Sequence, residues 1–113
     1  MKIKEELIGD ILHVVIEEKD ANLVVSDAFK ALMIERINSG NKNLIVSFKQ
    51  VDYVDSSFLG ALVSILKRVL PIGGKIVLTE INADISSLFE LTRLDKVFHL
   101  EKSLSQALKQ FEN

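Results

Sequence analysis

Residues 44–70 read LIVSFKQVDYVDSSFLGALVSILKRVL, and this stretch decides the fold. Residues 44–48 form a continuous apolar run, which is typical of a strand in the middle of a sheet. Residues 56–70 carry apolar side chains at helical spacing, and Pro71 with Gly73 and Gly74 ends that segment. The stretch therefore predicts a buried strand, a short loop and the longest helix of the chain.

The segments on both sides continue the alternation of strands and helices. Before that stretch we expect strands over 3–8 and 11–16 around a Gly9-Asp10 turn, a polar loop over 17–22, and a helix that starts at Ser26-Asp27 and ends near Gly40. After it we expect a strand over 75–79, a short helix capped by Asp84, a strand or extended turn over 97–100, and a last helix capped by Ser103. This order predicts an α/β fold, with a mixed but mostly parallel sheet of four or five strands flanked by about four helices.

Composition limits the classes of function. The 113 residues suit a single domain, residues 1–113, and 14 basic against 16 acidic residues argue against nucleic-acid binding. The chain has no Cys, which excludes disulfides and thiolate metal sites. No stretch reaches the roughly 18 apolar residues of a membrane span. Acids occupy the place where a signal peptide has its apolar centre, so we expect a cytoplasmic protein with no membrane partner.

The usual catalytic patterns are absent from the sequence. His13 and His99 are isolated in apolar strands, where a structural histidine is the simpler interpretation. The Gly73-Gly74 pair lies between a helix and a strand, whereas a phosphate loop runs from a strand to a helix. We therefore expect no enzyme, no cofactor and no metal site.

The polar run Asp55-Ser56-Ser57 stands between the central strand and the long helix. In an open α/β sheet this is the carboxyl end of a strand, where functional sites usually lie. An alternative interpretation is an ordinary helix cap, since one Asp or Ser satisfies the free amides of a first turn. Three such residues exceed what one cap needs, and both interpretations remain open.

The following helix has two sides. At 100° per residue the small and polar residues share one side, namely Ser56, Ser57, Gly60, Ser64, Lys67 and Arg68. The other side is a wide apolar arc whose edge residues, Leu59 and Val63, adjoin the polar strip. This edge suits docking of a protein, although packing against the sheet and a neighbouring helix explains it equally well.

Residues 54–60, VDSSFLG, resemble the D-S-[SA]-G-[LI]-G signature of STAS domains, the anti-sigma-factor antagonists of bacteria. Residues 44–54 resemble the strand and loop that precede this signature in the family. Residues 74–78, GKIVL, resemble its G-x-x-[LI]-x-[LIV] strand, and residues 91–98, LTRLDKVF, are similar to its L-x-x-[LT]-x-L-D-x-[LIV]-[FL] tail. The motifs follow in the family's order over essentially the whole chain, and the resemblance implies the mixed sheet flanked by helices expected above.

The resemblance also implies a function and a site. The chain would capture an anti-sigma factor and so release a sigma factor. Ser56 would be phosphorylated by a partner kinase that is also the anti-sigma factor, and a PP2C-type phosphatase would reverse the step. Asp55 would be its neighbour and Asp20 the acid beside the site. We expect the partner to contact residues around Ser56, namely Ser57, Phe58, Leu59, Gly60, Val63 and Lys67. An alternative is a constitutive adaptor or scaffold subunit in a stress-signalling or transport complex; monomer and dimer remain open.

Two positions depart from the family pattern. Phe58 stands where members usually have Gly, so its ring either alters the surface beside Ser56 or turns into the core, as the helical wheel favours. The loop before Asp20 usually carries a Gly, and here Glu17 or Glu18 occupies that place. Both departures concern the fit to the partner more than the fold.

Overall fold

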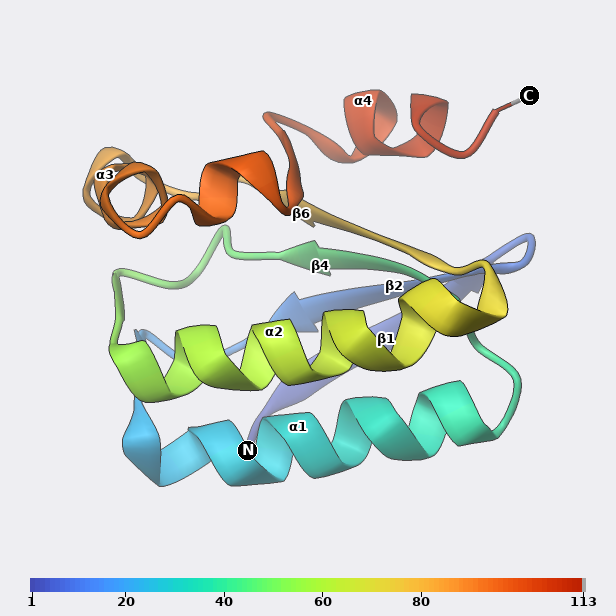
Figure 1. The fold of residues 1–113 in the computed structure, drawn as a ribbon, viewed down its shortest axis with the longest axis horizontal. Helices are drawn as coiled ribbons and strands as arrows, with labels where there is room; N and C mark the ends of the chain where they lie inside the picture. Colours follow the sequence, from blue (N-terminus) through green and yellow to red (C-terminus); the bar gives the residue numbers. More distant parts are fainter. Residues whose placement is uncertain (113) are drawn as a thin grey trace.

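A computed structural model describes residues 1–112 and contains one five-stranded sheet. The strands β1 (Ile3–Ile8) and β2 (Ile11–Ile16) form an antiparallel hairpin. Parallel to β2 lie β4 (Asn43–Ser47), β6 (Lys75–Thr79) and β7 (His99–Glu101), in the order β1-β2-β4-β6-β7. The expected α/β architecture with one antiparallel edge is confirmed (Figure 1).

Four helices cover the sheet. They are α1 (Leu23–Asn38), α2 (Ser56–Val69), α3 (Ala83–Leu91) and α4 (Leu104–Lys109), with short 3-10 turns η1 (Leu70–Ile72) and η2 (Leu94–Lys96). The helices α1 and α2 run side by side, and both begin at the same end of the molecule (Figure 1). That end is the carboxyl end of the parallel strands, because each helix follows a strand that runs toward it.

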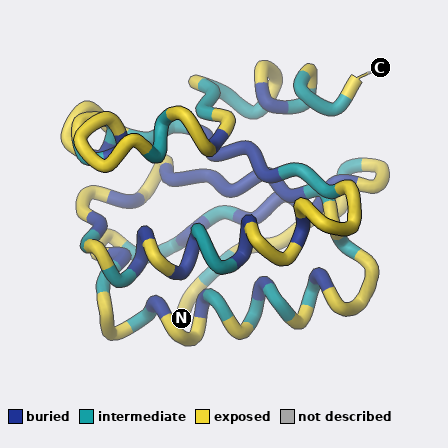
Figure 2. The backbone as a smooth tube through the Cα atoms, in the orientation of Figure 1, coloured by how far each residue is buried: buried dark blue, intermediate teal, exposed yellow. Residues whose placement is uncertain are grey.

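The sheet separates two apolar clusters of different size. The larger cluster lies between one face of the sheet and α1, α2 and α3, and contains Leu12, Val14 and Ile16 from β2. The smaller cluster joins Ile11, Ile45 and Val77 on the opposite face to Ala107 of α4. Side chains alternate along a strand, so neighbouring β2 residues serve different clusters. The buried backbone runs through the strands and the inner sides of α1 and α2 (Figure 2).

Several expected boundaries differ from the structure. The strand β4 covers 43–47 instead of 44–48, and α2 ends at Val69 instead of residue 70. The helix α1 is capped by Asn22, four residues before the expected cap Ser26, and starts at Leu23. With 16 residues it is longer than α2, which has 14 and was expected to be the longest helix. Ser26 is buried inside the first turn, where its hydroxyl donates to the carbonyl of Leu23. The cap of α3 is Asn82, and Asp84 lies in the first turn. The last strand covers 99–101 instead of 97–100.

A second, two-stranded sheet stands beside the first turns of the helices. Its strands β3 (Asp20–Ala21) and β5 (Tyr53–Val54) pair in parallel, with Asp20 opposite Tyr53. Part of the expected polar loop over 17–22 is therefore a strand. Two residues are too short to show the alternation from which a strand is recognised in a sequence. This small sheet brings two distant loops together.

Candidate functional site

The Asp55-Ser56-Ser57 run lies where β5 passes into α2. Ser56 is the first residue of α2 and is exposed, Ser57 is partly exposed, and Asp55 is the N-cap. The pairing of β3 with β5 holds Asp20, the first residue of β3, beside this run. The amide of Asp55 donates to the carbonyl of Ala21 at 3.3 Å, which adds to the same link.

The carboxylate of Asp55 serves both helices. Its Oδ1 accepts from the Phe58 amide of α2 at 3.0 Å, and its Oδ2 accepts from the Leu23 amide of α1 at 2.9 Å. Each bond satisfies a helix amide that has no partner within its own helix. The capping interpretation is therefore correct for Asp55. Ser56 and Ser57 do not act as caps of α2.

The start of α2 is suited to an anion attached to Ser56. The positive end of the helix dipole lies there, and free first-turn amides bind phosphate groups in many proteins. Within residues 1–112 the amides of Ser56 and Ser57 have no acceptor, and the Asp55 carboxylate is bonded to the amides of Phe58 and Leu23. An anion at the exposed Ser56 would therefore meet favourable backbone groups on its own chain.

The other predicted site residues differ in exposure and in their distance from Ser56. Asp20 is exposed and held at this corner by the pairing with Tyr53. Gly60 is exposed one turn after Ser56. Val63 is partly buried and packs against the main core. Lys67 is exposed, but eleven residues at 1.5 Å each place it about 16 Å along the axis from Ser56.

Phe58 and Leu59 need a correction, because both are buried and neither belongs to the exposed surface. The ring of Phe58 lies 5.0 Å from that of Phe29 on α1 and 6.2 Å from that of Phe48. The departure from the family pattern at this position therefore fills the core, as the helical wheel favours. The surface beside Ser56 is made by other residues.

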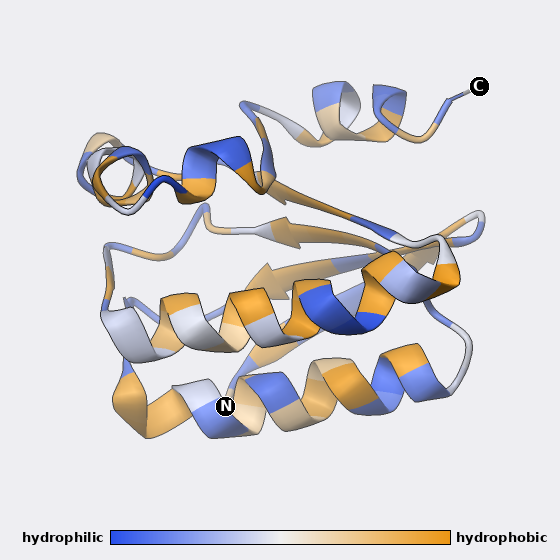
Figure 3. Cartoon of the chain, in the orientation of Figure 1, coloured by the Kyte–Doolittle hydropathy of each residue, from blue (hydrophilic) through white to orange (hydrophobic). Residues whose placement is uncertain are grey.

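Two exposed apolar residues at this corner were missed from the sequence. Leu23 is 65% exposed and Val24 is 86% exposed, both in the first turn of α1. The bond from Asp55 to the Leu23 amide places this turn next to Ser56. In Figure 3 the start of α1 is coloured as hydrophobic although it faces outward. The sequence signal was present, since three apolar residues follow the cap residue Asn22.

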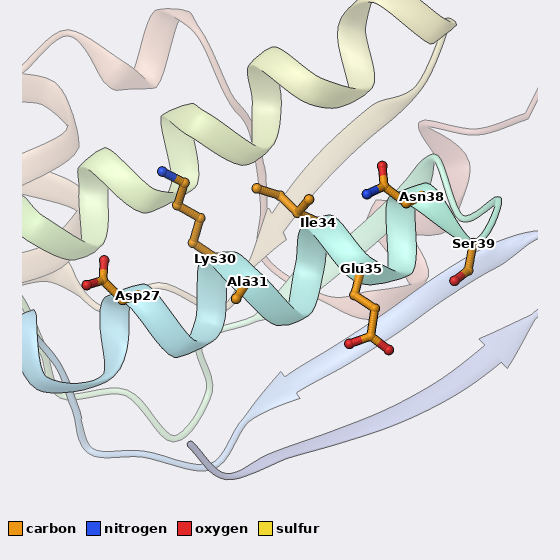
Figure 4. Close-up of a pocket in the computed structure, with 7 residues that line it drawn as sticks. All are labelled: Asp27, Lys30, Ala31, Ile34, Glu35, Asn38 and Ser39. Carbon is orange, nitrogen blue, oxygen red and sulfur yellow. The ribbon is translucent and has the colours of Figure 1, made fainter.

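A surface hollow of about 650 Å³ lies along α1. Figure 4 shows its lining residues, all of which come from α1 and the residue that ends it: Asp27, Lys30, Ala31, Ile34, Glu35, Asn38 and Ser39. Lys30 and Ile34 point toward the side of α2, whereas Glu35 points away from it (Figure 4). None of the predicted site residues lines this hollow, which is a broad face of mixed charge.

Neither a metal cluster nor a membrane span is found in the described part of the chain. Across residues 1–112 no three His, Asp or Glu side chains are grouped in a way that would hold a metal ion. Over the same residues no helix has the length and apolar character needed to cross a bilayer.

His13 is buried on β2, and its Nδ1 lies 3.2 Å from Oε1 of Glu6 on the neighbouring strand.

A family model of the STAS domain matches residues 6–107. The chain belongs to the STAS domain family. This agrees with the order of strands and helices and with the signature at Ser56. It also makes the corner formed by β3, β5 and the starts of α1 and α2 the region to compare with other STAS domains.

Similar proteins include bacterial regulators. A candidate anti-sigma factor antagonist of Thermotoga neapolitana is 25% identical over 108 residues, covering 95% of each chain. The crystal structure of a candidate anti-sigma factor antagonist of Thermotoga maritima has a TM-score of 0.87 at 24% identity, covering 96% of this STAS domain and 92% of that chain. The Bacillus cell fate determinant SpoIIAA in its phosphorylated form has a TM-score of 0.76 at 13% identity, covering 98% and 100%. At these identities the structural likeness concerns the fold.

Proposed function

We propose that this STAS domain protein is an anti-sigma factor antagonist controlled by phosphorylation of Ser56. The observation that carries the proposal is an exposed serine hydroxyl at the first position of α2, where Asp55 has already taken the capping role. The similar structure of SpoIIAA in a phosphorylated form supports a phosphate-tolerant fold. In the proposed cycle the protein binds an anti-sigma factor that is a serine kinase, and a PP2C-type phosphatase restores it, all in the cytoplasm.

The switch acts on the partner and leaves the fold in place. A phosphate adds about −1.5 to −2 charges and three acceptor oxygens. At the start of α2 those charges are tolerated. In a fitted interface the same group adds bulk, a desolvation cost and repulsion from facing acids. A loss of about 3 kcal/mol weakens binding more than a hundredfold.

Gly60 gives independent support for a partner at this surface. A glycine in a helix interior costs about 1 kcal/mol relative to alanine. At Gly60 a Cβ would meet no atom within 4 Å, so packing inside this chain does not require the glycine. A partner that approaches α2 closely supplies a reason for its presence.

The direct test uses the serine kinase encoded in the same genome, with ATP and mass spectrometry to locate phosphate. We expect phosphate on Ser56, and Ser56→Asp lowers kinase affinity at least about a hundredfold in calorimetry. Phosphate only at another residue would contradict the Ser56 assignment. Tight kinase binding that Ser56→Asp leaves unchanged would favour the constitutive adaptor instead.

Gly60→Ala tests the contact surface without adding charge. We expect the unfolding free energy to rise by about 0.5–1 kcal/mol while kinase binding weakens. Ser64→Ala, one turn further along α2, serves as the matched helix control. Equal binding of the Gly60→Ala variant and the wild type would remove Gly60 from the interface.

A further inference from the structure

A small groove lies between β5 and α3, beside the loop that leads to Ser56. Its walls are Tyr53 and Val54 of β5 together with Ile85 and Leu88 of α3. Asp52 and Asp84 also line it, and both are exposed. Its volume is about 250 Å³. Small-molecule pockets usually measure about 300–1,000 Å³, so the size suits a single inserted side chain better than a metabolite.

The groove is held in shape by a side chain outside it. The Nδ2 of Asn82 donates to the carbonyl of Asp52 at 3.1 Å and to that of Val51 at 3.4 Å. The Oδ1 of Asn82 caps α3 by accepting from the Ile85 amide at 2.8 Å. Asn82 therefore joins the start of α3 to the segment before β5, and the groove is formed before any ligand arrives.

The chemistry of the groove combines an apolar lining with two acidic residues. Val54 and Ile85 are buried beneath it, Leu88 is partly buried, and Tyr53 is 55% exposed. The carboxylates of Asp52 and Asp84 are exposed. Within residues 1–112 no ion pair uses either of them, since the ion pairs found there involve Glu5, Glu6 and Glu35. A matching ligand has an apolar side chain flanked by positive charge.

We propose that this groove binds one apolar side chain of a partner protein segment in which lysine or arginine flanks that side chain. The inference deepens the proposed function, because Tyr53 is two residues from Asp55 and the groove extends the surface around Ser56. The two carboxylates select the basic flanks, and the apolar lining holds the inserted side chain. The groove thus determines which segment of the partner is recognised.

The first experiment is independent of any kinase. The peptide Ac-GSKKLKKSG-NH₂ is titrated into the ¹⁵N-labelled protein, with Ac-GSEELEESG-NH₂ and Ac-GSKKGKKSG-NH₂ as charge and side-chain controls. We expect saturable shifts at Tyr53, Val54 and Leu88 with the first peptide only. Asp52→Asn/Asp84→Asn abolishes them, whereas Asp27→Asn on α1 leaves them. Equal shifts with the leucine-free peptide, or none at the groove, would overturn the proposal.

The second experiment uses the kinase that phosphorylates Ser56. We expect Asp52→Asn/Asp84→Asn and Tyr53→Ser each to weaken binding by about tenfold or more, and Asp27→Asn to have no effect. The melting temperature should fall by only a few degrees, because Asp84 favours the start of α3 and Tyr53 belongs to β5. Unchanged kinase affinity in both variants contradicts the groove while the phospho-switch stands. Selective peptide binding without any kinase binding contradicts the proposed function while the groove stands. If the protein self-associates in size-exclusion chromatography and the peptide prevents this, the groove binds a second copy of the chain. That result would overturn the proposal of a different partner protein.

Discussion

The first turns of α1 and α2 lie next to each other but have opposite patterns. In α2 the first residue, Ser56, is exposed, and Phe58 and Leu59 are buried. In α1 the first residues, Leu23 and Val24, are exposed and apolar, and Ser26 is buried. The α2 turn follows the usual rule for a helix against a core, and the α1 turn reverses it.

The difference shows that the two turns contribute differently to the molecule. At the start of α2 the inward residues Phe58 and Leu59 pack in the core and stabilise the fold, and the outward residue is Ser56. The start of α1 places apolar area in water, which costs free energy unless a partner covers it. Asp55 joins the two turns, so the exposed apolar residues are kept beside Ser56. Three predictions test this comparison, from the largest effect to the smallest.

Phe58→Ala should lower the unfolding free energy by about 3–5 kcal/mol, because it removes a buried ring between Phe29 and Phe48. Val24→Ala is the matched control in the other turn and should change stability by under about 0.5 kcal/mol. Urea unfolding followed by circular dichroism measures both. Similar losses in the two variants would show that the two turns do not differ as described.

Asp55→Ala should cost about 2 kcal/mol, and Asn22→Ala about 1 kcal/mol, because Asp55 caps α2 and also bonds to α1. Asp55→Asn separates the two bonds. Its amide oxygen still accepts from Phe58, but its NH₂ group cannot accept from Leu23. We expect an intermediate loss for this variant, with faster amide hydrogen exchange at Leu23 only. Faster exchange at Phe58 as well would contradict the division of the two bonds.

Ser56→Asp should change the unfolding free energy by less than about 1 kcal/mol, since the helix start favours the new charge and Asp55 opposes it. Thermal melting would show a shift of only a few degrees. Val24→Asp, near the start of α1, is the comparison variant and should behave similarly. A large loss of stability in Ser56→Asp alone would mean that Ser56 has a structural role, and that a phosphate there would disturb the fold.

Much of the fold could be predicted from the sequence. The strand over 75–79 and the start of α2 at Ser56 agree with the structure to the residue, because the apolar runs there are continuous and bounded by breakers. The start of α1 could not be predicted in this way. Ser26 and Asp27 looked like a cap, whereas Asn22 and the distant Asp55 satisfy the first amides and let the helix begin earlier.

The candidate site, like the fold, could be predicted from the sequence only in part. The Asp55-Ser56-Ser57 run and its position between strand and helix were evident in the sequence. The β3–β5 pairing, the exposed Leu23 and Val24, and the groove walled by α3 were not, because each joins segments that are far apart in the chain. Local patterns carry information over one or two turns, and these features depend on contacts between distant residues.

The sequence by itself determined the order of the main strands and helices and the position of a serine at the start of a helix. Only the tertiary structure decided that Phe58 turns inward, that Asp55 serves two helices, and that acids and apolar residues meet in a groove beside Ser56. The reason is physical. Periodicity and capping act within a few residues, whereas the Asp55–Leu23 bond joins residues 32 positions apart that lie together only in the folded chain.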